Sequence, residues 1–86
     1  MKTIWKFVLR PDQPVTMPKK SRLLSVGVQG EDIVLWAQVE STASQVKRDI
    51  VVVPTGDNAT TVASYPFVGT VQLHGLVFHV FDGGEQ

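Results

Sequence analysis

Short runs of β-branched and aromatic residues alternate with polar residues along most of the chain, and turn-forming residues separate the runs. Residues 2–9 have a period of two, with Thr3, Trp5, Phe7 and Leu9 on one face of the segment. This alternation predicts a strand, and Pro11 ends it. Further strands are predicted at 22–29, 33–40, 49–54, 67–73 and 76–81, with a short edge strand at 15–17 in a proline-rich loop.

These runs predict an all-β fold, either a small antiparallel barrel or a two-layer sandwich of about six strands, in a single domain over 1–86. The turns "GED" and "HG" predict hairpins over 22–39 and 67–81. The polar stretch 41–48 is expected to form a loop, and the glycine-rich tail 82–86 is expected to fray. The residues expected to be buried are Phe7, Leu35, Val51, Val71 and Phe78.

The composition excludes several classes of site. The 86 residues include no cysteine, so disulfides, thiolate metal sites and cysteine nucleophiles are impossible. No signal peptide and no apolar run long enough for a membrane helix is visible, so neither a secretory route nor a membrane partner is expected. A thin core and two half-apolar outer faces, Ile4 with Val8 and Val34 with Trp36, predict a homo-oligomer.

Charge is distributed unevenly along a chain whose net charge is zero. Six of the eight cations lie at or before Arg22, and seven of the eight acidic residues follow it. A neutral, dipolar chain is poorly suited to wrapping duplex nucleic acid, but its basic part suits a small anion. The ligand-binding residues expected on this basis are Lys6, Arg10, Lys19, Arg22 and Trp36, with Lys2 as an addition. The alternative is a solvated charged face.

Catalytic and metal-binding patterns are missing from the sequence. The two histidines, without cysteines, give no metal signature, and no nucleophile–base spacing or diagnostic carboxylate pair is present. We therefore expect no enzyme activity, no metal and no cofactor. His79 is either a core residue or part of a ligand site, and Thr55 with Gly56 could offer backbone N–H groups to an anion.

Five stretches resemble a family of small uncharacterised proteins encoded by bacteriophages and prophages. These stretches are "MKTIWKF" at the start, "MPK" at 17–19, "LW" at 35–36, "VGT" at 68–70 and "LVFHVF" at 76–81. The resemblance covers nearly the whole chain and implies a phage accessory protein that acts inside a bacterium. The chain departs from the family pattern at Lys20, where glycine is expected, and at Asp57, where histidine is often expected.

Two functional hypotheses follow. In the first, a non-enzymatic phage protein binds a small anionic, nucleotide-like host molecule and sequesters a bacterial immune signal as counter-defence. In the second, the protein is an interaction module that inhibits a host or defence protein through an apolar face or an edge strand.

Overall fold

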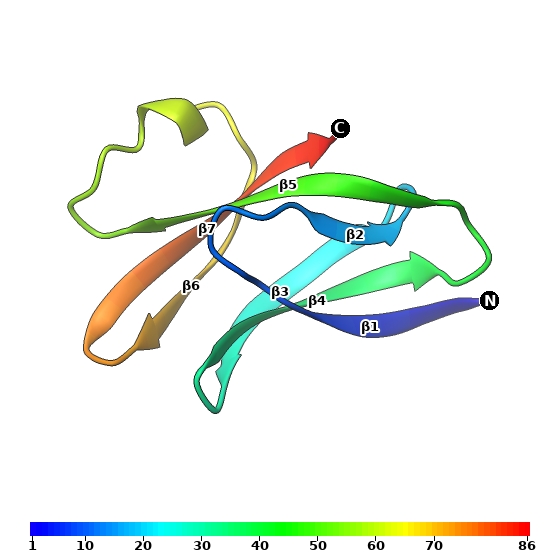
Figure 1. The fold of residues 1–86 in the computed structure, drawn as a ribbon, viewed down its shortest axis with the longest axis horizontal. Helices are drawn as coiled ribbons and strands as arrows, with labels where there is room; N and C mark the ends of the chain where they lie inside the picture. Colours follow the sequence, from blue (N-terminus) through cyan, green and yellow to red (C-terminus); the bar gives the residue numbers. More distant parts are fainter.

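The structure, a computed structural model, describes residues 1–86 and contains seven strands and one short 3₁₀ turn (Figure 1). The strands are β1 (Lys2–Val8), β2 (Val15–Pro18), β3 (Arg22–Gln29), β4 (Asp32–Glu40), β5 (Gln45–Pro54), β6 (Phe67–Leu73) and β7 (Leu76–Glu85), with the turn η1 (Thr60–Val62) between β5 and β6. The predicted all-β class is confirmed.

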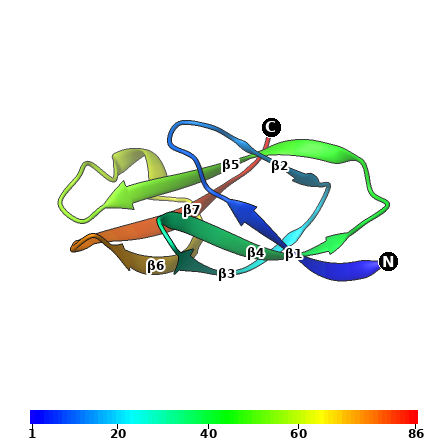
Figure 2. The same ribbon diagram turned by 60° about the horizontal axis from the view of Figure 1, so that its bottom comes forward.

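The strands form two antiparallel sheets that pack as two layers (Figure 2). The first sheet has the order β1-β4-β3 and the second has the order β2-β5-β7-β6. Strands β3 and β6 lie side by side where the sheets meet, but no strand pairing joins the two sheets. The molecule is therefore a sandwich and not a closed barrel.

The core lies between the two sheets and centres on Met17 and Leu35, both of which are fully buried. Leu35 lies opposite Phe7 on β1 and Val26 on β3, so the alternate residues of three strands point into the same layer. The prediction of a buried side chain is confirmed for Leu35 and Val71. It is wrong for Phe7, Val51 and Phe78, which are half-buried because so small a sandwich leaves the margins of its core open to water.

Both predicted hairpins are present. Strands β3 and β4 pair from Arg22 to Gln38 around a turn at Gly30, and β6 and β7 pair around the turn His74–Gly75. His74 and Gly75 both have positive φ, at 54° and 76°, as a two-residue turn between twisted antiparallel strands requires.

Two predicted loops are strands instead. Gln45–Arg48, expected within a loop, is the first part of β5 and pairs with β2. The tail 82–86, expected to fray, continues β7 to Glu85 and pairs with Arg48 and Asp49. A β-bulge between Asp49 and Ile50 explains the glycines, because a Cβ on Gly83 would lie 2.8 Å from the Cβ of Asp49.

Lys20, which stands where the family resemblance suggests glycine, has a φ of 62°. That left-handed conformation is unfavourable for a lysine and easy for glycine. The Lys20 backbone N–H donates to the Glu85 carboxylate at 2.5 Å, which ties the β2–β3 turn to the end of β7. Lys20 therefore adopts the left-handed backbone conformation that a glycine at this position would adopt easily.

Unequal lengths of β2 and β5 define the most open part of the fold. Strand β2 pairs with β5 only from Gln45, opposite Pro18, to Arg48, opposite Val15. The prolines at positions 14 and 18 limit the length of β2. Strand β5 continues to Pro54 with β7 on one side and no strand on the other. We call residues 49–54 the free half of β5.

Candidate functional site

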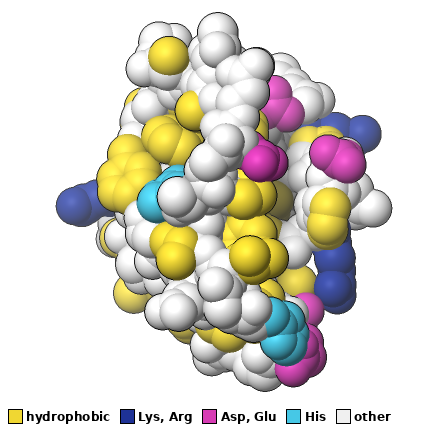
Figure 3. All heavy atoms as spheres, turned by 90° about the vertical axis from the view of Figure 1, so that its left-hand side faces the viewer, with side chains coloured by type: hydrophobic (Ala, Val, Ile, Leu, Met, Phe, Trp, Pro, Cys, Tyr) yellow, Lys and Arg dark blue, Asp and Glu magenta, His cyan; other side chains and the backbone are white.

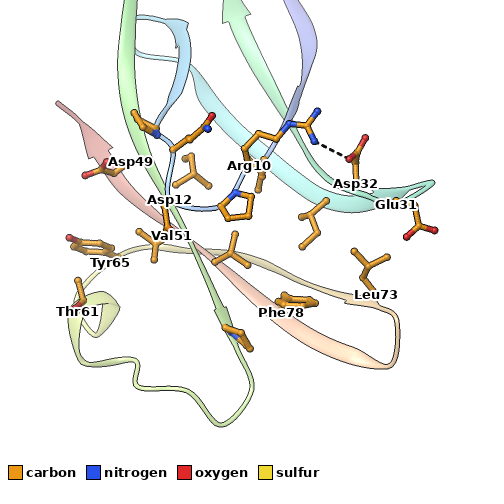
Figure 4. Close-up of a pocket in the computed structure, with 18 of the residues that line it drawn as sticks. Arg10, Asp12, Glu31, Asp32, Asp49, Val51, Thr61, Tyr65, Leu73 and Phe78 are labelled. Carbon is orange, nitrogen blue, oxygen red and sulfur yellow. Dashed lines mark hydrogen bonds and ion pairs between the residues drawn. The ribbon is translucent and has the colours of Figure 1, made fainter.

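A cleft of about 810 Å³ lies along the free half of β5 (Figure 4). The β1–β2 loop and the β3–β4 turn form one wall, and the β6–β7 hairpin contributes Leu73 and Phe78. Thr61 and Tyr65, in and after η1, lie on the other side of β5. The volume is within the range of sites that bind small molecules or short peptide segments.

The cleft is lined largely by apolar side chains. Ile33, Val52, Leu73 and Phe78 are half-buried and come from four different strands or turns. Val52 and Phe78 belong to the face of the second sheet that points toward the first sheet, at the end where β2 no longer lies beside β5. Figure 3 shows hydrophobic side chains exposed in a hollow at this end of the molecule, with carboxylates near its margin. The lining therefore favours an apolar group.

Charged groups around the cleft are mostly acidic. Its lining includes Asp12, Glu31, Asp32 and Asp49 but only one cation, Arg10. The Arg10 guanidinium lies 3.4 Å from the Asp32 carboxylate, Glu31 contacts the His74 ring, and Asp49 accepts a hydrogen bond from the Gln86 side chain at 2.7 Å. Asp12 makes no ion pair or side-chain hydrogen bond. With four carboxylates against one guanidinium, the cleft favours a cationic ligand over an anionic one.

Backbone groups of β5 also face the cleft. The Thr55 N–H bonds to the Val77 carbonyl and the Lys47 carbonyl accepts from Gln86, so the odd-numbered residues of β5 bond toward β7. The Ser44 carbonyl accepts from the Lys19 N–H, so the even-numbered residues bond toward β2. Beyond Arg48 the even-numbered residues Ile50 and Val52 therefore direct their N–H and C=O groups into the space where β2 has ended.

A family model described as a domain of unknown function (DUF7352) matches residues 1–86. The chain belongs to this family. The prediction of an uncharacterised family that spans nearly the whole chain is thus confirmed. Comparisons with curated proteins and with solved structures found no significant match.

The cations expected to bind a ligand are not gathered at the cleft of this DUF7352 chain. Lys6 and Arg10 line a smaller groove of about 310 Å³ between β1 and residues 13–16, and no acidic side chain lines that groove. Lys6 also donates to the Gln29 side chain at 2.8 Å. Lys19, Arg22 and Trp36 line neither the cleft nor the groove.

Trp36 and Arg22 lie on the outer face of the first sheet. Trp36 pairs across the sheet with Lys6 and Ser25, and Arg22 lies opposite Gln38. The Trp36 indole covers β3 so closely that a Cβ on Gly27 would lie 2.9 Å from its ring. Trp36 is therefore occupied in packing against its own sheet.

The additional candidates lie in separate places. Lys2 is exposed and lies opposite Glu40 on β4. The His79 ring has the Thr55 hydroxyl 2.7 Å from Nε2 and the Thr70 hydroxyl 3.0 Å from Nδ1. Both ring nitrogens are thus paired with hydroxyls, an arrangement that fits a structural histidine. Gly56 has a φ of 95° in the turn that follows β5, beside Thr55.

The structure contains no group of three or more histidine and carboxylate side chains placed to hold a metal ion. None of its helical segments has the length and apolar character needed to cross a membrane. The groups available at the cleft are apolar side chains, carboxylates and strand backbone, which suit binding.

The acidic cleft was missed by sequence reasoning, because its lining comes from segments far apart in the chain. One local signal was available. The prolines around "VTM" restrict that strand to a few residues, while "IVVV" continues the neighbouring strand with β-branched residues. A long apolar strand beside a short one leaves part of its edge unpaired.

Proposed function

We propose that this protein is a non-enzymatic binding module whose cleft accepts an apolar, positively charged group of a partner protein. The observation that carries the proposal is the combination of a half-buried apolar lining with four carboxylates and a single arginine. It favours the interaction-module hypothesis over the binding of an anion at this cleft, since an anion there would face net negative charge.

The cellular setting of this proposal rests on the family resemblance. We propose a phage accessory protein in the bacterial host cytoplasm that inhibits a host or defence protein. Exposed apolar side chains outside the cleft, Ile4 at 59%, Phe67 at 59% and Leu76 at 57%, support self-association as a further property.

A pair of matched indoles tests the proposal by NMR. Tryptamine carries a cation and indole-3-propionate an anion on the same ring system. Tryptamine is expected to shift the backbone amide signals of Val52, Leu73 and Phe78, and indole-3-propionate is expected to leave them unchanged. Shifts at the cleft from the anion alone, or from neither compound, would contradict the proposal.

A charge variant provides the control. Asp12→Asn removes one carboxylate and keeps a residue that tolerates the φ of 58° at this position. It should weaken tryptamine binding severalfold, while Asp57→Asn, on an exposed loop outside the cleft, should have no effect.

The smaller groove supports a second candidate function, the binding of a small nucleotide-like anion and its sequestration as a bacterial immune signal. Lys6 and Arg10 line this groove without an acidic neighbour among its lining residues. A cyclic nucleotide from a tested panel should then raise the melting temperature, and the shift should shrink with added salt. Lys6→Ala should abolish the shift and Lys47→Ala, outside the groove, should retain it. An unchanged melting temperature with every nucleotide would exclude this candidate.

A further inference from the structure

The free half of β5 differs from the edge strand β1. The edge strand β1 carries Lys2 and Lys6, and lysines on an edge oppose the addition of another strand. The free half of β5 carries the run Ile50–Val53 without a charge, and it lies inside a cleft with walls on both sides. An uncharged, β-branched edge inside a cleft is suited to pairing with an extended chain.

Hydrogen-bonding capacity remains at this edge. Ile50 and Val52 direct their N–H and C=O groups away from β7, as the alternation along β5 requires. No loop backbone bonds to these groups, and no side chain does. Two residues with both groups free offer four hydrogen bonds to one added strand.

We propose that the partner binds by strand addition: an extended segment of a partner protein pairs with Ile50 and Val52 in the line of β2. This inference rests on the proposed function of the cleft and specifies how the partner is held. Every strand pair in the structure is antiparallel, and the added segment takes the same direction. At about 3.4 Å per residue, four or five residues cover the free half of β5.

The cleft also defines the chemistry of the segment. A residue that bonds to Ile50 or Val52 shares their face of the sheet, so its side chain points toward Phe78 and Ile33 and is apolar. The alternate residues point toward the side of Thr61 and Tyr65. Basic side chains at the ends of the segment complement the surrounding carboxylates. The segment is thus a short β-branched strand flanked by lysine or arginine.

The probe is the blocked pentapeptide Ac-Lys-Val-Thr-Val-Lys-NH₂, whose two valines are placed opposite Ile50 and Val52. Backbone N-methylation of the two valines removes the donors that face β5, and N-methylation of the threonine removes a donor that faces away. Binding is expected to fall at least tenfold with the methylated valines and to change less than threefold with the methylated threonine. An equal loss from both modifications, or from neither, would overturn strand addition.

Amide hydrogen exchange reports the same event on the protein. Saturating peptide should slow exchange at Ile50 and Val52 at least tenfold and leave Val51 and Val53, already bonded to β7, unchanged. Protection that instead grows with protein concentration, without peptide, would identify a second copy as the occupant and overturn the proposal. The analogue with glutamate in place of both lysines should bind at least tenfold more weakly, and equal binding would overturn the charge assignment.

The two proposals fail in different ways. If tryptamine binds the cleft but valine N-methylation has no effect on the peptide, strand addition is wrong and the apolar, acidic site remains. If neither tryptamine nor the peptide perturbs the cleft, the proposed function itself is wrong.

Discussion

The two halves of β5 have opposite surroundings. The first half, Gln45–Arg48, is paired with β2 along its whole length, and Arg48 at its end also pairs with Glu85 of β7. Here the half-buried Arg48 donates to both Asp82 oxygens, at 3.1 and 2.6 Å, and to the Ser21 carbonyl at 2.6 Å. The second half is bonded to β7 alone and borders the cleft.

Charged and apolar residues follow one another along β5 in the opposite order to the one that would protect a free strand edge from aggregation. Lys47 and Arg48 lie in the half that is already paired, and the free half, after Asp49 at its start, consists of the uncharged run Ile50–Val53 and Pro54. A strand that only had to avoid aggregation would carry its charges at the free edge. The first half contributes contacts that stabilise the fold, and the uncharged edge of the second half is the feature on which the proposed strand addition rests.

Removal of the Asp82 carboxylate gives the largest expected effect on the paired half. Asp82→Ala leaves the Arg48 guanidinium, only 12% exposed, without its bidentate partner. Loss of one member of such a pair costs about 3–5 kcal/mol of unfolding free energy. Urea unfolding measures it, with Asp57→Ala as an exposed control that should change stability by less than about 0.5 kcal/mol. A small loss in Asp82→Ala would show that the paired half is not stabilised by this contact.

Truncation of apolar side chains compares the two halves directly. Met17, on β2 opposite Val46, is fully buried, so Met17→Ala should cost about 2–5 kcal/mol. Phe78, opposite Pro54 at the free half, is half-buried and faces the cleft, so Phe78→Ala should cost about 1–2 kcal/mol, below the usual range for a buried phenylalanine. Equal losses in a denaturant titration would mean that the cleft is as well packed as the core.

Acid should lower the free energy of unfolding by protonating Asp82, the partner of Arg48 in the paired half. Hydrogen bonds from Arg48 hold the pKa of Asp82 below its usual value, with a smaller contribution from the Gly84 N–H. A carboxyl whose pKa is lowered on folding stabilises the protein above its ordinary pKa of about 4, and this stability is lost as the pH falls toward the folded pKa.

In Asp82→Asn the loss of unfolding free energy between pH 5 and pH 3 should therefore be shallower than in the original protein. Some slope remains, because a hydrogen bond from the N-terminal ammonium also lowers the pKa of Glu40. Identical slopes in urea titrations of the two proteins would show that the Arg48–Asp82 pair does not contribute to the acid response.

Regular features of the fold were predictable from the sequence because local chemistry specifies them. The turns at Gly30 and Gly75 and the alternation from Ile33 to Val39 were sufficient for both hairpins. The tail was not predictable, because glycines at 83 and 84 resemble a flexible end until the bulge opposite Asp49 is seen. The polar segment 45–48 was missed because Arg48 is paired with a residue 34 positions away.

The cleft could be predicted least. The cations near the start of the chain attracted attention by their spacing, yet the cleft is lined by acidic residues from the β1–β2 loop, the β3–β4 turn and β5. Sequence spacing shows which side chains share a strand face. It does not show how long each strand is. Because β2 begins only at Val15, no strand lies beside the free half of β5.

The most direct test of the difference between the two halves is amide hydrogen exchange in the free protein. The N–H groups of Val46 and Arg48, directed to β2, and of Val51 and Val53, directed to β7, should exchange slowly. Those of Ile50 and Val52, in the middle of the same strand, should exchange at least tenfold faster. Protection of Ile50 and Val52 equal to that of Val46 and Arg48 would contradict the account, because β5 would then have no free half.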